Sequence, residues 1–546
     1  MCRRLPAALL CALTALAFGG AAAFAAGTTT AATTTTTPAT TGTTGTTTTG
    51  TTTGTTTTGT TSKKTPPPPV VVPAVLSKLL ASNAISQSEY TSYRRQWAGT
   101  LQEQKALGGW RKTQLAGVTA LLNELATDKQ MTAARLPDLF LMLHENAQYW
   151  KAGAKLAYGA RVQFPGSLLE WEYYPGYGLQ LQVLGTFGEA NGFYEAGPAD
   201  YQDLTQVLNE MEQLAVPRAG GIAWEYYFNW EGGSPPWVSA MSQATGIEAL
   251  TNGYLATADS SYLAEAHEAL PLLEKAPPSG VGVKTPLGRR YLQYSFAPKT
   301  DIINAFLQTL IGLYDYGKVS NDPVAERLFN QGNAQAQSEV SSFVVPGWSL
   351  YQPGQLDDLS YHELVTGFAQ SLCQKLAVAV YCNAYEAWST DMVTLPSMQQ
   401  VTTTAPANKK FSFKFTISKP ANVGITVSSG GKNFIYTKQL FSSGTHSFAG
   451  PKMKAGSYSL AMSVTDLVGH YAHLSGTLDV CKGSCPSPPV PATTPVVTTT
   501  TTVTTTTTTT TPTTTTPTTT SPSRTSTITT PTTTPTETST TGGGAV

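Results

Sequence analysis

The sequence predicts a mainly α-helical protein in which an α/α toroid, a barrel-like ring of helix pairs, is followed by a small antiparallel β-sandwich. Three patterns predict this architecture. Apolar residues recur at helical spacing at Leu115, Val118, Leu122 and Leu125. Loops rich in glycine, proline and aromatic residues separate the expected helices, and binding residues concentrate on the loops of a rigid scaffold. After residue 400 the apolar period changes to alternation, which is typical of strands.

Two helix starts stand out in residues 74–398, the range expected to form the toroid. Residues 259–260, Asp-Ser, precede an apolar run, and residues 321–322, Asn-Asp, precede Pro323. Short polar side chains cap the first turn of a helix, and proline fits there because its missing N–H is not needed. Both sites therefore predict the beginning of a helix.

Residues 302–316 and 361–388 are further helix candidates. Cys373 and Cys382 lie nine positions apart in the second of these segments. That spacing points the two side chains to opposite sides of one helix. We therefore expect each cysteine in the core or paired with a distant segment.

Residues 401–486 are expected to form the β-sandwich. Apolar and polar residues alternate at 411–417, 423–427 and 458–464, and a Ser-Gly-Gly turn lies at 429–431. Such alternation buries one face of each strand, which favours antiparallel sheets packed face to face. The expected role of this region is accessory, as a spacer or as a weak surface-binding module.

The N-terminus has the pattern of a secretory signal in residues 1–25. Arg3 and Arg4 precede an apolar run from Leu5 to Phe24 that ends in small residues. We therefore expect an exported protein, secreted or held at the cell surface. No other stretch is long and apolar enough to span a bilayer, so no transmembrane segment is expected in the mature chain.

Residues 26–73 and 487–546 consist mostly of threonine with glycine or proline. Such tracts cannot bury a core, so we expect a disordered linker and a disordered tail. A stalk associated with a cell wall or matrix is one interpretation, and a spacer without a partner is the other.

Charge and cysteine content argue against several kinds of site. The 34 basic and 34 acidic residues balance without a visible basic stripe, so a nucleic-acid partner is not expected. Cys481 and Cys485 would close a small disulfide loop in an exported protein. The chain lacks zinc-binding Cys/His spacing, phosphate-binding loops and the Gly-x-Ser-x-Gly motif. No metal or cofactor is predicted.

Tyrosine and tryptophan gather in loops of the expected helical region, at residues 173–178, 232–237 and 346–348. A single loop tyrosine usually packs at the edge of a core. Clusters beside turn glycines instead favour a carbohydrate ligand, because aromatic faces stack on sugar rings while Tyr O–H and Trp N–H groups supply polar contacts.

A series of motifs runs in a fixed order between residues 174 and 388. The series is Tyr-Pro-Gly-Tyr-Gly-Leu-Gln at 174–180, Trp-Val-Ser-Ala-Met-Ser-Gln-Ala at 237–244, Asn-Ala-Phe at 304–306, Leu-Ile-Gly-Leu-Tyr-Asp-Tyr at 310–316, Trp-Ser-Leu-Tyr at 348–351 and Ser-Tyr-His at 360–362. It resembles the C-terminal catalytic domain of the D-glucuronyl C5-epimerase family. The resemblance implies an α/α barrel that inverts C5 of glucuronate units in a heparan-type polysaccharide, so a uronic-acid polysaccharide is the expected partner.

Inversion at C5 explains why tyrosines are prominent in these motifs. A proton next to a carboxylate leaves one face of the sugar, and another returns to the opposite face. This requires two acid/base groups and stabilisation of an enolate-like intermediate. Tyrosine suits the acid role, whereas as a base it needs a pKa lowered from about 10.

The resemblance implies roles for individual residues. Three tyrosines correspond to the family's catalytic tyrosines, namely Tyr294, Tyr351 and Tyr361. The substrate-binding residues that it implies are His362, Gln293, Tyr177, Trp237, Gln243, Asn304 and Arg290. His362 is either a group that positions substrate or tunes Tyr361, or a packing residue. Arg290 either neutralises the substrate carboxylate or lies on the surface of a turn.

Gln293 departs from the family pattern, which has glutamate before the first tyrosine. An amide cannot act as a base, so the chain must use another group, react slowly or have another activity. Other carboxylates in or near the loops are Glu225, Asp357, Asp358 and Glu363. For each of them, a solvated position at the surface is the favoured interpretation.

Three functions are compatible with these observations. The leading one is an extracellular uronate C5-epimerase that acts on a heparosan-like polysaccharide. A polysaccharide lyase shares proton abstraction at C5 and then expels the group at C4. A glycan-binding protein of the cell envelope would keep the cleft without turnover, and Gln293 is the residue that keeps this alternative open.

Overall fold

The computed structural model describes residues 71–483. The expected leader in residues 1–25, the threonine-rich linker up to residue 70, Cys485 and the tail in 487–546 lie outside this range. Within the described part of the chain, no helix combines the length and apolar character needed to cross a membrane.

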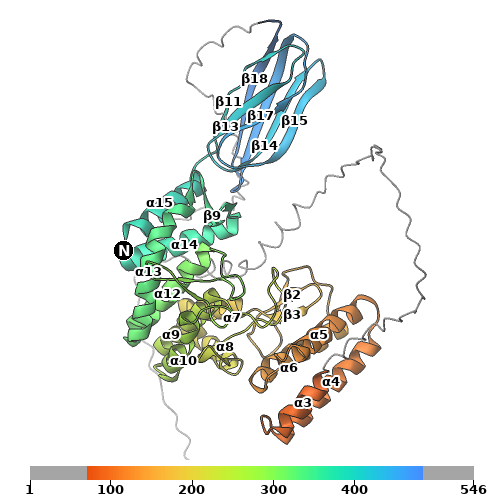
Figure 1. Cartoon of the computed structure of the whole chain (residues 1–546), viewed down its shortest axis with the longest axis vertical. Coiled ribbons are helices and arrows are strands. Elements are labelled where there is room, and N and C mark those ends of the chain that lie inside the picture. Colours follow the sequence, from red (N-terminus) through yellow and green to blue (C-terminus); the bar gives the residue numbers. More distant parts are fainter. Residues whose placement is uncertain (1–70, 484–546) are drawn as a thin grey trace, which may run out of the picture. The chain divides into compact units, whose positions relative to one another are not determined.

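Residues 72–393 are mainly helical (Figure 1). The helices are α3 (Val72–Ala81), α4 (Gln87–Ala106), α5 (Gly109–Thr127), α6 (Leu136–Ala152), α7 (Val183–Ala196), α8 (Tyr201–Glu212), α9 (Ala240–Thr257), α10 (Ser261–Ala269), α11 (Pro271–Glu274), α12 (Ile303–Ser320), α13 (Pro323–Glu339), α14 (Leu359–Leu376) and α15 (Ala379–Val393), with 3-10 turns η1 (Ala133–Arg135), η2 (Pro198–Asp200) and η3 (Val340–Phe343). One hydrophobic core extends from α3 to α15. The four apolar residues used to predict a helix are buried on α5, which confirms that prediction.

Both predicted helix starts are confirmed. Ser260 directly precedes α10, and Asp259 Oδ1 accepts a hydrogen bond from Ser261 N at 2.9 Å. Asp322 caps α13 by accepting a hydrogen bond from Val324 N at 2.8 Å. These short acidic side chains satisfy N–H groups that have no partner within the helix.

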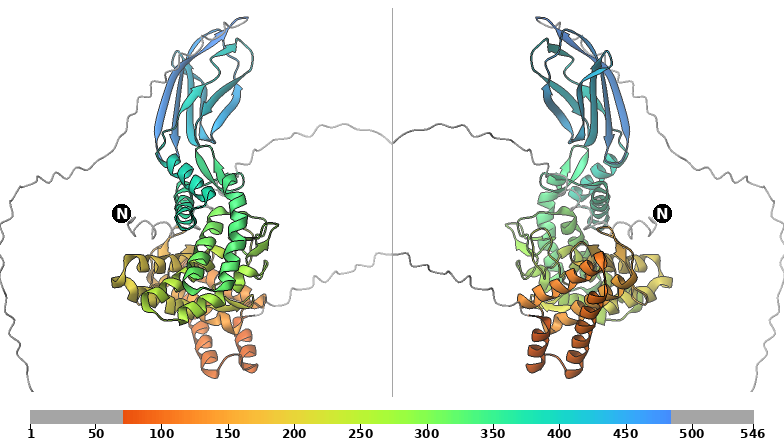
Figure 2. Two further views of the ribbon diagram at one scale, coloured as in Figure 1. Left: turned by 90° about the vertical axis from the view of Figure 1, so that its left-hand side faces the viewer. Right: turned by 90° about the vertical axis from the view of Figure 1, so that its right-hand side faces the viewer.

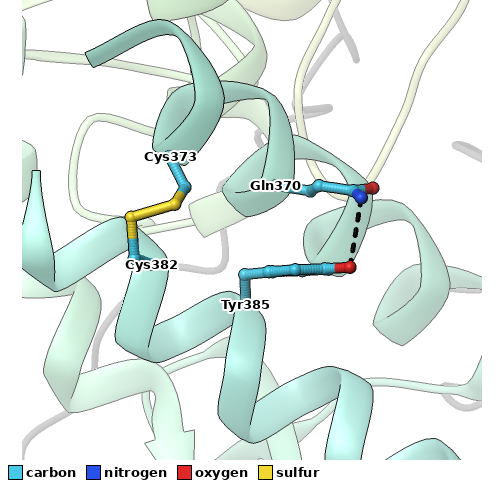
Figure 3. Close-up of a disulfide and its surroundings, with 4 residues drawn as sticks. All are labelled: Gln370, Cys373, Cys382 and Tyr385. Atoms are coloured by element: carbon cyan, nitrogen blue, oxygen red, sulfur yellow. Dashed lines mark hydrogen bonds between the residues drawn. A yellow bond between two sulfur atoms is a disulfide. The ribbon is translucent and has the colours of Figure 1, made fainter. Parts of the chain in front are cut away.

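The prediction of one helix over residues 361–388 was wrong, and so was the prediction for its cysteines. Ala377, with φ of 53°, ends α14 in a left-handed conformation, and α15 begins two residues later. The two helices pack side by side, and Cys373 forms a disulfide with Cys382 across a Cα–Cα distance of 4.8 Å (Figure 3). Opposite orientation holds only within a continuous helix, and the break removes that constraint.

Short strands occur between the helices and were missed from sequence. They are β1 (Arg161–Val162), β2 (Trp171–Tyr174) and β3 (Gly178–Leu181) in one sheet, β8 (Val344–Val345), β9 (Trp348–Gln352) and β10 (Gln355–Leu356) in a second, and the hairpins β4 (Val216–Arg218) with β5 (Gly221–Ala223) and β6 (Gly282–Lys284) with β7 (Arg289–Tyr291). Strands of two to five residues are too short to show alternation. They support the loops that carry the motifs.

The rest of the described chain is rich in β-structure (Figure 2). Its strands are β11 (Met398–Gln400), β12 (Thr404–Pro406), β13 (Phe411–Ile417), β14 (Ala421–Ser429), β15 (Lys432–Phe441), β16 (Gly444–Gly450), β17 (Gly456–Asp466) and β18 (Tyr471–Cys481). They form a three-stranded sheet in the order β11-β13-β16 and a five-stranded sheet in the order β12-β18-β17-β14-β15. Apolar residues from both sheets share one core, so the predicted alternation is confirmed. Cys481 is disulfide-bonded.

Lys419 joins the β-rich part to the helical part. Its side chain is 2% exposed, pairs with Asp466 at 2.9 Å, and donates to Asp391 O at 2.6 Å and Thr394 O at 3.0 Å. Gly347, with φ of 80°, lies against it, and a Cβ there would come within 2.3 Å of Lys419 Cβ. The contact between the two parts therefore requires glycine at position 347, and it surrounds the Lys419 ammonium with three oxygen acceptors.

The two parts have opposite charge. Residues 71–400 contain 20 Lys and Arg against 31 Asp and Glu, whereas residues 401–483 contain 9 Lys against 2 Asp. The balanced composition of the whole chain conceals this division. It corrects the expectation that no concentration of basic residues exists.

Candidate functional site

Tyr294 follows the β6–β7 hairpin and is fixed by the segment that begins α9. Ser295 N donates to Val238 O at 2.9 Å, and Ala240 N donates to Leu292 O at 3.0 Å. The Tyr294 ring meets Trp237 edge-on, with centroids 5.6 Å apart. Two motifs separated by more than fifty residues therefore lie together.

Tyr351 and Tyr361 complete a cluster with Tyr294. Tyr351 lies on β9, and Tyr361 lies in the first turn of α14, where its N–H donates to Asp358 at 2.9 Å. The rings of Tyr351 and Tyr361 are 4.9 Å apart, and Tyr294 is close enough to raise the pKa of both hydroxyls. The structure thus brings together the three tyrosines singled out from the motifs.

Burial controls the electrostatics of this cluster. Tyr294, Tyr351 and Tyr361 are 2%, 6% and 4% exposed. Loss of hydration raises the pKa of all three hydroxyls, and the nearby charge of Glu231 raises each pKa further. The tyrosines are therefore protonated at neutral pH, which suits them to donate a proton or a hydrogen bond.

Glu231 lies in a tight turn beside the cluster. Trp230 N donates to Gly233 O at 3.1 Å, and Gly233 N donates to Trp230 O at 2.7 Å. Glu231 and Gly232 have φ of 45° and 85°, the signs found in a type I′ turn, whose first position favours Asn, Asp or Gly. Holding glutamate there costs on the order of 1 kcal/mol. Such strain is characteristic of functional positions.

The turn is fixed against the tyrosines by aromatic packing. A Cβ on Gly233 would come within 2.2 Å of the Phe296 ring, and Phe296 stacks on Tyr294 at 5.2 Å. Trp230 lies beside Tyr294 and lowers the pKa of its hydroxyl, an effect smaller than that of burial. Glu231 still reaches solvent although surrounding protein atoms partly bury its carboxylate, which therefore lies at the boundary between water and the buried hydroxyls. The sequence offered one signal for it, the Gly-Gly pair that follows.

His362 is a packing residue in this structure. It is fully buried, stacks on Trp348 at 3.8 Å, and contacts Ser349 Oγ at 2.7 Å and Trp388 O at 3.1 Å. Burial lowers the pKa of His362 to about 4. The roles considered for His362 were positioning substrate or tuning Tyr361, and packing. The structure favours packing, because both ring nitrogens form hydrogen bonds within the protein.

Ser349 links His362 to the buried carboxyl of Asp357. Trp388 O can only accept, so the neutral His362 ring carries its proton on Nε2 and its Nδ1 must accept from Ser349. The single hydroxyl proton of Ser349 is then donated to His362. The contact between Ser349 and Asp357 therefore requires that the Asp357 carboxyl carries a proton of its own. Burial raises the pKa of Asp357 to about 7, which agrees with this count of protons.

The other residues implied as substrate-binding fall into two groups. In the first group, the Trp237 ring contacts the ring of Tyr294, and the half-buried Tyr177 contacts the ring of Phe228. Gln243 and Asn304 are buried and bond backbone groups, with Gln243 donating to Ile222 O at 3.0 Å and Asn304 accepting from Ala305 N at 2.7 Å. This second pair supports α9 and α12, and its predicted contact with substrate stays a prediction.

Arg290 and Gln293 depart from their implied roles in different ways. Arg290 forms ion pairs with Asp301 and Glu339, so its charge is already matched within the protein, and its role toward a substrate carboxylate stays a prediction. Gln293 is 3% exposed and lies close enough to Tyr294 to lower the pKa of its hydroxyl. Among the described residues, its Oε1 has no hydrogen-bond partner. It lies at the cluster but brings no carboxylate.

Surface solvation was wrong for two of the four loop carboxylates. Glu225 is 1% exposed and pairs with Arg135 at 2.6 Å and Arg218 at 2.5 Å, while Asp357 is 3% exposed. Glu363 is exposed, and Asp358 is half-buried as the cap of α14. The paired charges of Glu225 indicate a structural role.

A second buried polar network was missed from sequence. Gln182 donates to Glu172 at 3.2 Å, and Tyr226 donates to Gln182 at 3.1 Å and contacts Ser242 at 2.8 Å. Arg161 pairs with Glu172 at 3.3 Å. Ser242 belongs to the motif at residues 237–244, whereas Arg161, Glu172, Gln182 and Tyr226 lie outside the quoted motifs, so the sequence did not indicate that these residues meet.

Comparison with known proteins connects the tyrosine cluster to one family. Residues 220–390 match the family model described as the D-glucuronyl C5-epimerase C-terminus. The D-glucuronyl C5-epimerase of Caenorhabditis elegans is 38% identical over 87 residues, which are 16% of this chain and 14% of that protein. The chain therefore aligns with a small share of this relative.

Solved structures show weaker likenesses. A GH76 α-mannanase of Bacteroides thetaiotaomicron has a TM-score of 0.30 and 12% identity, over 42% of this chain and 66% of that one. The cellobiose 2-epimerase of Bacillus thermoamylovorans has a TM-score of 0.30 and 13% identity, over 51% and 73%. A sugar epimerase from a ruminal bacterium has a TM-score of 0.26 and 11% identity, over 38% and 72%. Likenesses at this level do not establish a shared fold.

The matched range contains Tyr294, Tyr351, Tyr361 and the Glu231 turn. The resemblance inferred from the motifs is thus confirmed: over residues 220–390, this chain matches the D-glucuronyl C5-epimerase family in its C-terminal domain.

Proposed function

We propose that the chain is a uronate C5-epimerase that inverts C5 of D-glucuronate units in a heparosan-like polysaccharide. One observation carries the proposal. Tyr294, Tyr351 and Tyr361 come from three separate segments and meet in one buried cluster, in which the rings of Tyr351 and Tyr361 pack together and Tyr294 raises the pKa of both hydroxyls. The family match over the same residues supports the choice of reaction.

The tyrosines act as proton donors in this proposal. Their raised pKa values keep the hydroxyls protonated at neutral pH. One hydroxyl returns a proton to C5, and another donates a hydrogen bond to the enolate-like oxygens, where preorganised donors stabilise developing charge. The same raised pKa values argue against a phenolate as the first base.

We assign the base role to Glu231, because position 293 carries an amide. Glu231 is the acidic residue whose charge acts on all three tyrosines, whereas Asp357 and Asp358 act on Tyr361. Burial raises the pKa of Glu231, which increases its affinity for a proton. Its exposed position lets the carboxylate reach a sugar ring that enters from solvent.

Access to the tyrosines requires movement, since each ring is more than nine-tenths buried. The Trp230–Gly233 turn is the element that packs on Tyr294 and also reaches solvent. Displacement of this turn would uncover the hydroxyls and carry Glu231 with it.

Solvent isotope exchange tests the proposal. The full chain is incubated with heparosan, an unsulfated glucuronate polymer, in deuterated water and followed by proton NMR. Deuterium at C5 of intact chains is expected. An unsaturated uronate on shortened chains would establish a lyase instead, and no exchange on glucuronate polymers would reject both catalytic functions.

Gln293 supports one second candidate, a glycan-binding protein without turnover. A buried amide at the position of the family's acid is the expected result of lost catalysis. Polymer binding without C5 exchange would establish this candidate in the same experiment.

Architecture and location belong to the same proposal. The paired packing of α7 with α9 and of α12 with α9 supports an α/α toroid, and the shared core of the two sheets supports a β-sandwich. The residue pattern of positions 1–25 supports export, and the threonine-rich tracts support attachment to a wall or matrix.

A further inference from the structure

The five-stranded sheet of the β-rich part has a face that its core does not cover. Strand register aligns the outward residues of β15, β14, β17 and β18 into three cross-strand rows. The rows are Leu440-Asn422-Thr465-Tyr471, Lys438-Gly424-Ser463-His473 and Tyr436-Thr426-Ala461-Ser475. We call these residues the outer face.

Side-chain size varies regularly across the outer face. The two central strands, β14 and β17, carry Asn, Thr, Ser, Gly and Ala, while the outer strands β15 and β18 carry tyrosine, leucine, lysine and histidine together with one small residue, Ser475. Adjacent strands lie about 4.8 Å apart, so about 14 Å separates β15 from β18. That width accommodates one extended sugar chain along the strands, with hydroxyl side chains beneath it.

The large side chains of this face are unusually exposed. Within residues 71–483, Tyr436 and Tyr471 are the most exposed aromatic side chains, at 71% and 52%, and Leu440 is 39% exposed. Tyr471 stacks on His473 with centroids 6.2 Å apart and an angle of 25° between the ring planes. Exposed aromatic groups gathered on one face are characteristic of binding sites.

The excess of lysine over aspartate in the β-rich part favours an anionic partner for the outer face. Eight of the nine lysines in residues 401–483 are exposed, and Lys419 is buried. Of the two aspartates, Asp466 is buried against Lys419, which leaves Asp479 as the exposed acid in that range. Lys438 lies in the middle row, and no ion pair engages it within the described chain. The β-rich part therefore attracts polyanions, while the acidic helical part repels them.

We propose that the outer face is a binding site for an anionic polysaccharide, in which Tyr436 and Tyr471 contact sugar rings and Lys438 contacts a uronate carboxylate. The proposal rests on the proposed function only for the choice of a uronate chain, and such binding needs no turnover. By holding the polymer, the face would raise its local concentration at the tyrosine cluster.

A polysaccharide fits this face better than a nucleic acid. A single lysine stands among twelve residues of the three rows, whereas a nucleic-acid surface needs a dense basic stripe to match the phosphates. The serine, threonine and asparagine side chains of the central strands match sugar hydroxyls, which offer both donors and acceptors.

Affinity electrophoresis and calorimetry of the full chain with heparosan test the site, with neutral dextran and single-stranded DNA as comparison ligands. We expect Tyr436→Ala with Tyr471→Ala to weaken heparosan binding about tenfold, and Lys438→Ala about threefold. The matched control Lys410→Ala removes an exposed lysine away from the face and should bind like the parent. Thermal unfolding verifies that each variant is folded.

Each outcome has a definite reading. Unchanged heparosan binding in the folded double tyrosine variant would overturn the proposal, as would equal binding of dextran. DNA binding that is at least as tight and is lost in the same variant would assign the face to nucleic acid instead. Tyr361→Phe should keep full heparosan binding, so a failure of the epimerase proposal would not be mistaken for a failure of this one.

Discussion

The tyrosine cluster of the helical part and the two tyrosines of the outer face differ in how much of each side chain is exposed. In the helical part Tyr294, Tyr351 and Tyr361 are at most 6% exposed, while in the β-rich part Tyr436 and Tyr471 are more than half exposed. Net charge reverses as well, with acidic residues in excess in 71–400 and lysine in excess in 401–483. We propose that the same residue type serves proton chemistry in one part and ring contact in the other.

This difference in exposure suits the two sets of tyrosines to different functions, the exposed set to binding a polymer and the buried set to a reaction on it. A buried tyrosine has a raised pKa and a fixed hydroxyl, which suits a reaction step. An exposed tyrosine offers its ring face at little cost, which suits a weak and reversible contact. Variants in the helical part should consequently alter C5 exchange and leave polymer binding by the outer face unchanged, and variants of the outer face should alter polymer binding.

The largest effect is expected from Tyr361→Phe. Loss of this hydroxyl should reduce C5 exchange on heparosan about a thousandfold, because it removes a donor from the cluster. Heparosan binding should stay unchanged. Tyr385→Phe, which removes a hydroxyl of α15 that accepts from Gln370, is the matched control (Figure 3). Equal exchange in Tyr361→Phe and the parent would remove this tyrosine from the mechanism.

Asp357→Asn should change the pH dependence of stability in the helical part. Burial raises the folded pKa of Asp357 to about 7 from an ordinary 3.8, so its protonated form stabilises the fold at low pH. That stability is lost as pH rises from about 4 to about 7, by on the order of 3 kcal/mol. Asparagine imitates the protonated acid, because its amide donates to Ser349 at every pH.

Chemical denaturation at pH 4.5 and pH 8 measures this effect. The parent should lose more unfolding free energy between the two values than Asp357→Asn. The exposed Asp128→Asn serves as control and should follow the parent. The same pH dependence in parent and Asp357→Asn would show that Asp357 is ionised throughout.

Glu231→Gln should reduce C5 exchange about a hundredfold, as expected for loss of a general base. Because burial raises the pKa of Glu231, the parent should lose activity as pH falls through a value above the ordinary 4.5. The variant should lack this acidic limb. Glu363→Gln, an exposed carboxylate on α14, is the control. If Gln293→Glu raises exchange while Glu231→Gln changes nothing, the base belongs at position 293.

Replacing Cys373 and Cys382 by alanine should have the smallest effect. A loop of this length contributes about 2.5 kcal/mol through the entropy of the unfolded chain. Urea denaturation should show this loss, whereas heparosan binding by the β-rich part should not change. A loss of binding would mean that the helical part supports the outer face.

Regular patterns made much of the fold predictable. Alternation at Phe411–Ile417 and the cap at Asp322 appear in the structure as a strand and a helix start, because both depend on local sequence. The tyrosine cluster was accessible through motif order alone, since no local pattern brings Tyr294 beside Tyr351.

Features set by tertiary contacts were not predictable. The break at Ala377 lacks glycine or proline, so nothing local marked the reversal that pairs the cysteines. Arg290 looked available for substrate because its partners, Asp301 and Glu339, are distant along the chain. Glu231 went unnoticed because its importance comes from packing of Gly233 on Phe296.

Lys419 has an evolutionary consequence. Its buried ammonium takes acceptors from both parts, Asp466 on one side and the carbonyls of Asp391 and Thr394 on the other. Separating the parts would leave the Lys419–Asp466 ion pair in place and would remove the two carbonyl acceptors that the helical part supplies. A domain that replaced residues 401–483 would therefore need a lysine at this position to keep both hydrogen bonds.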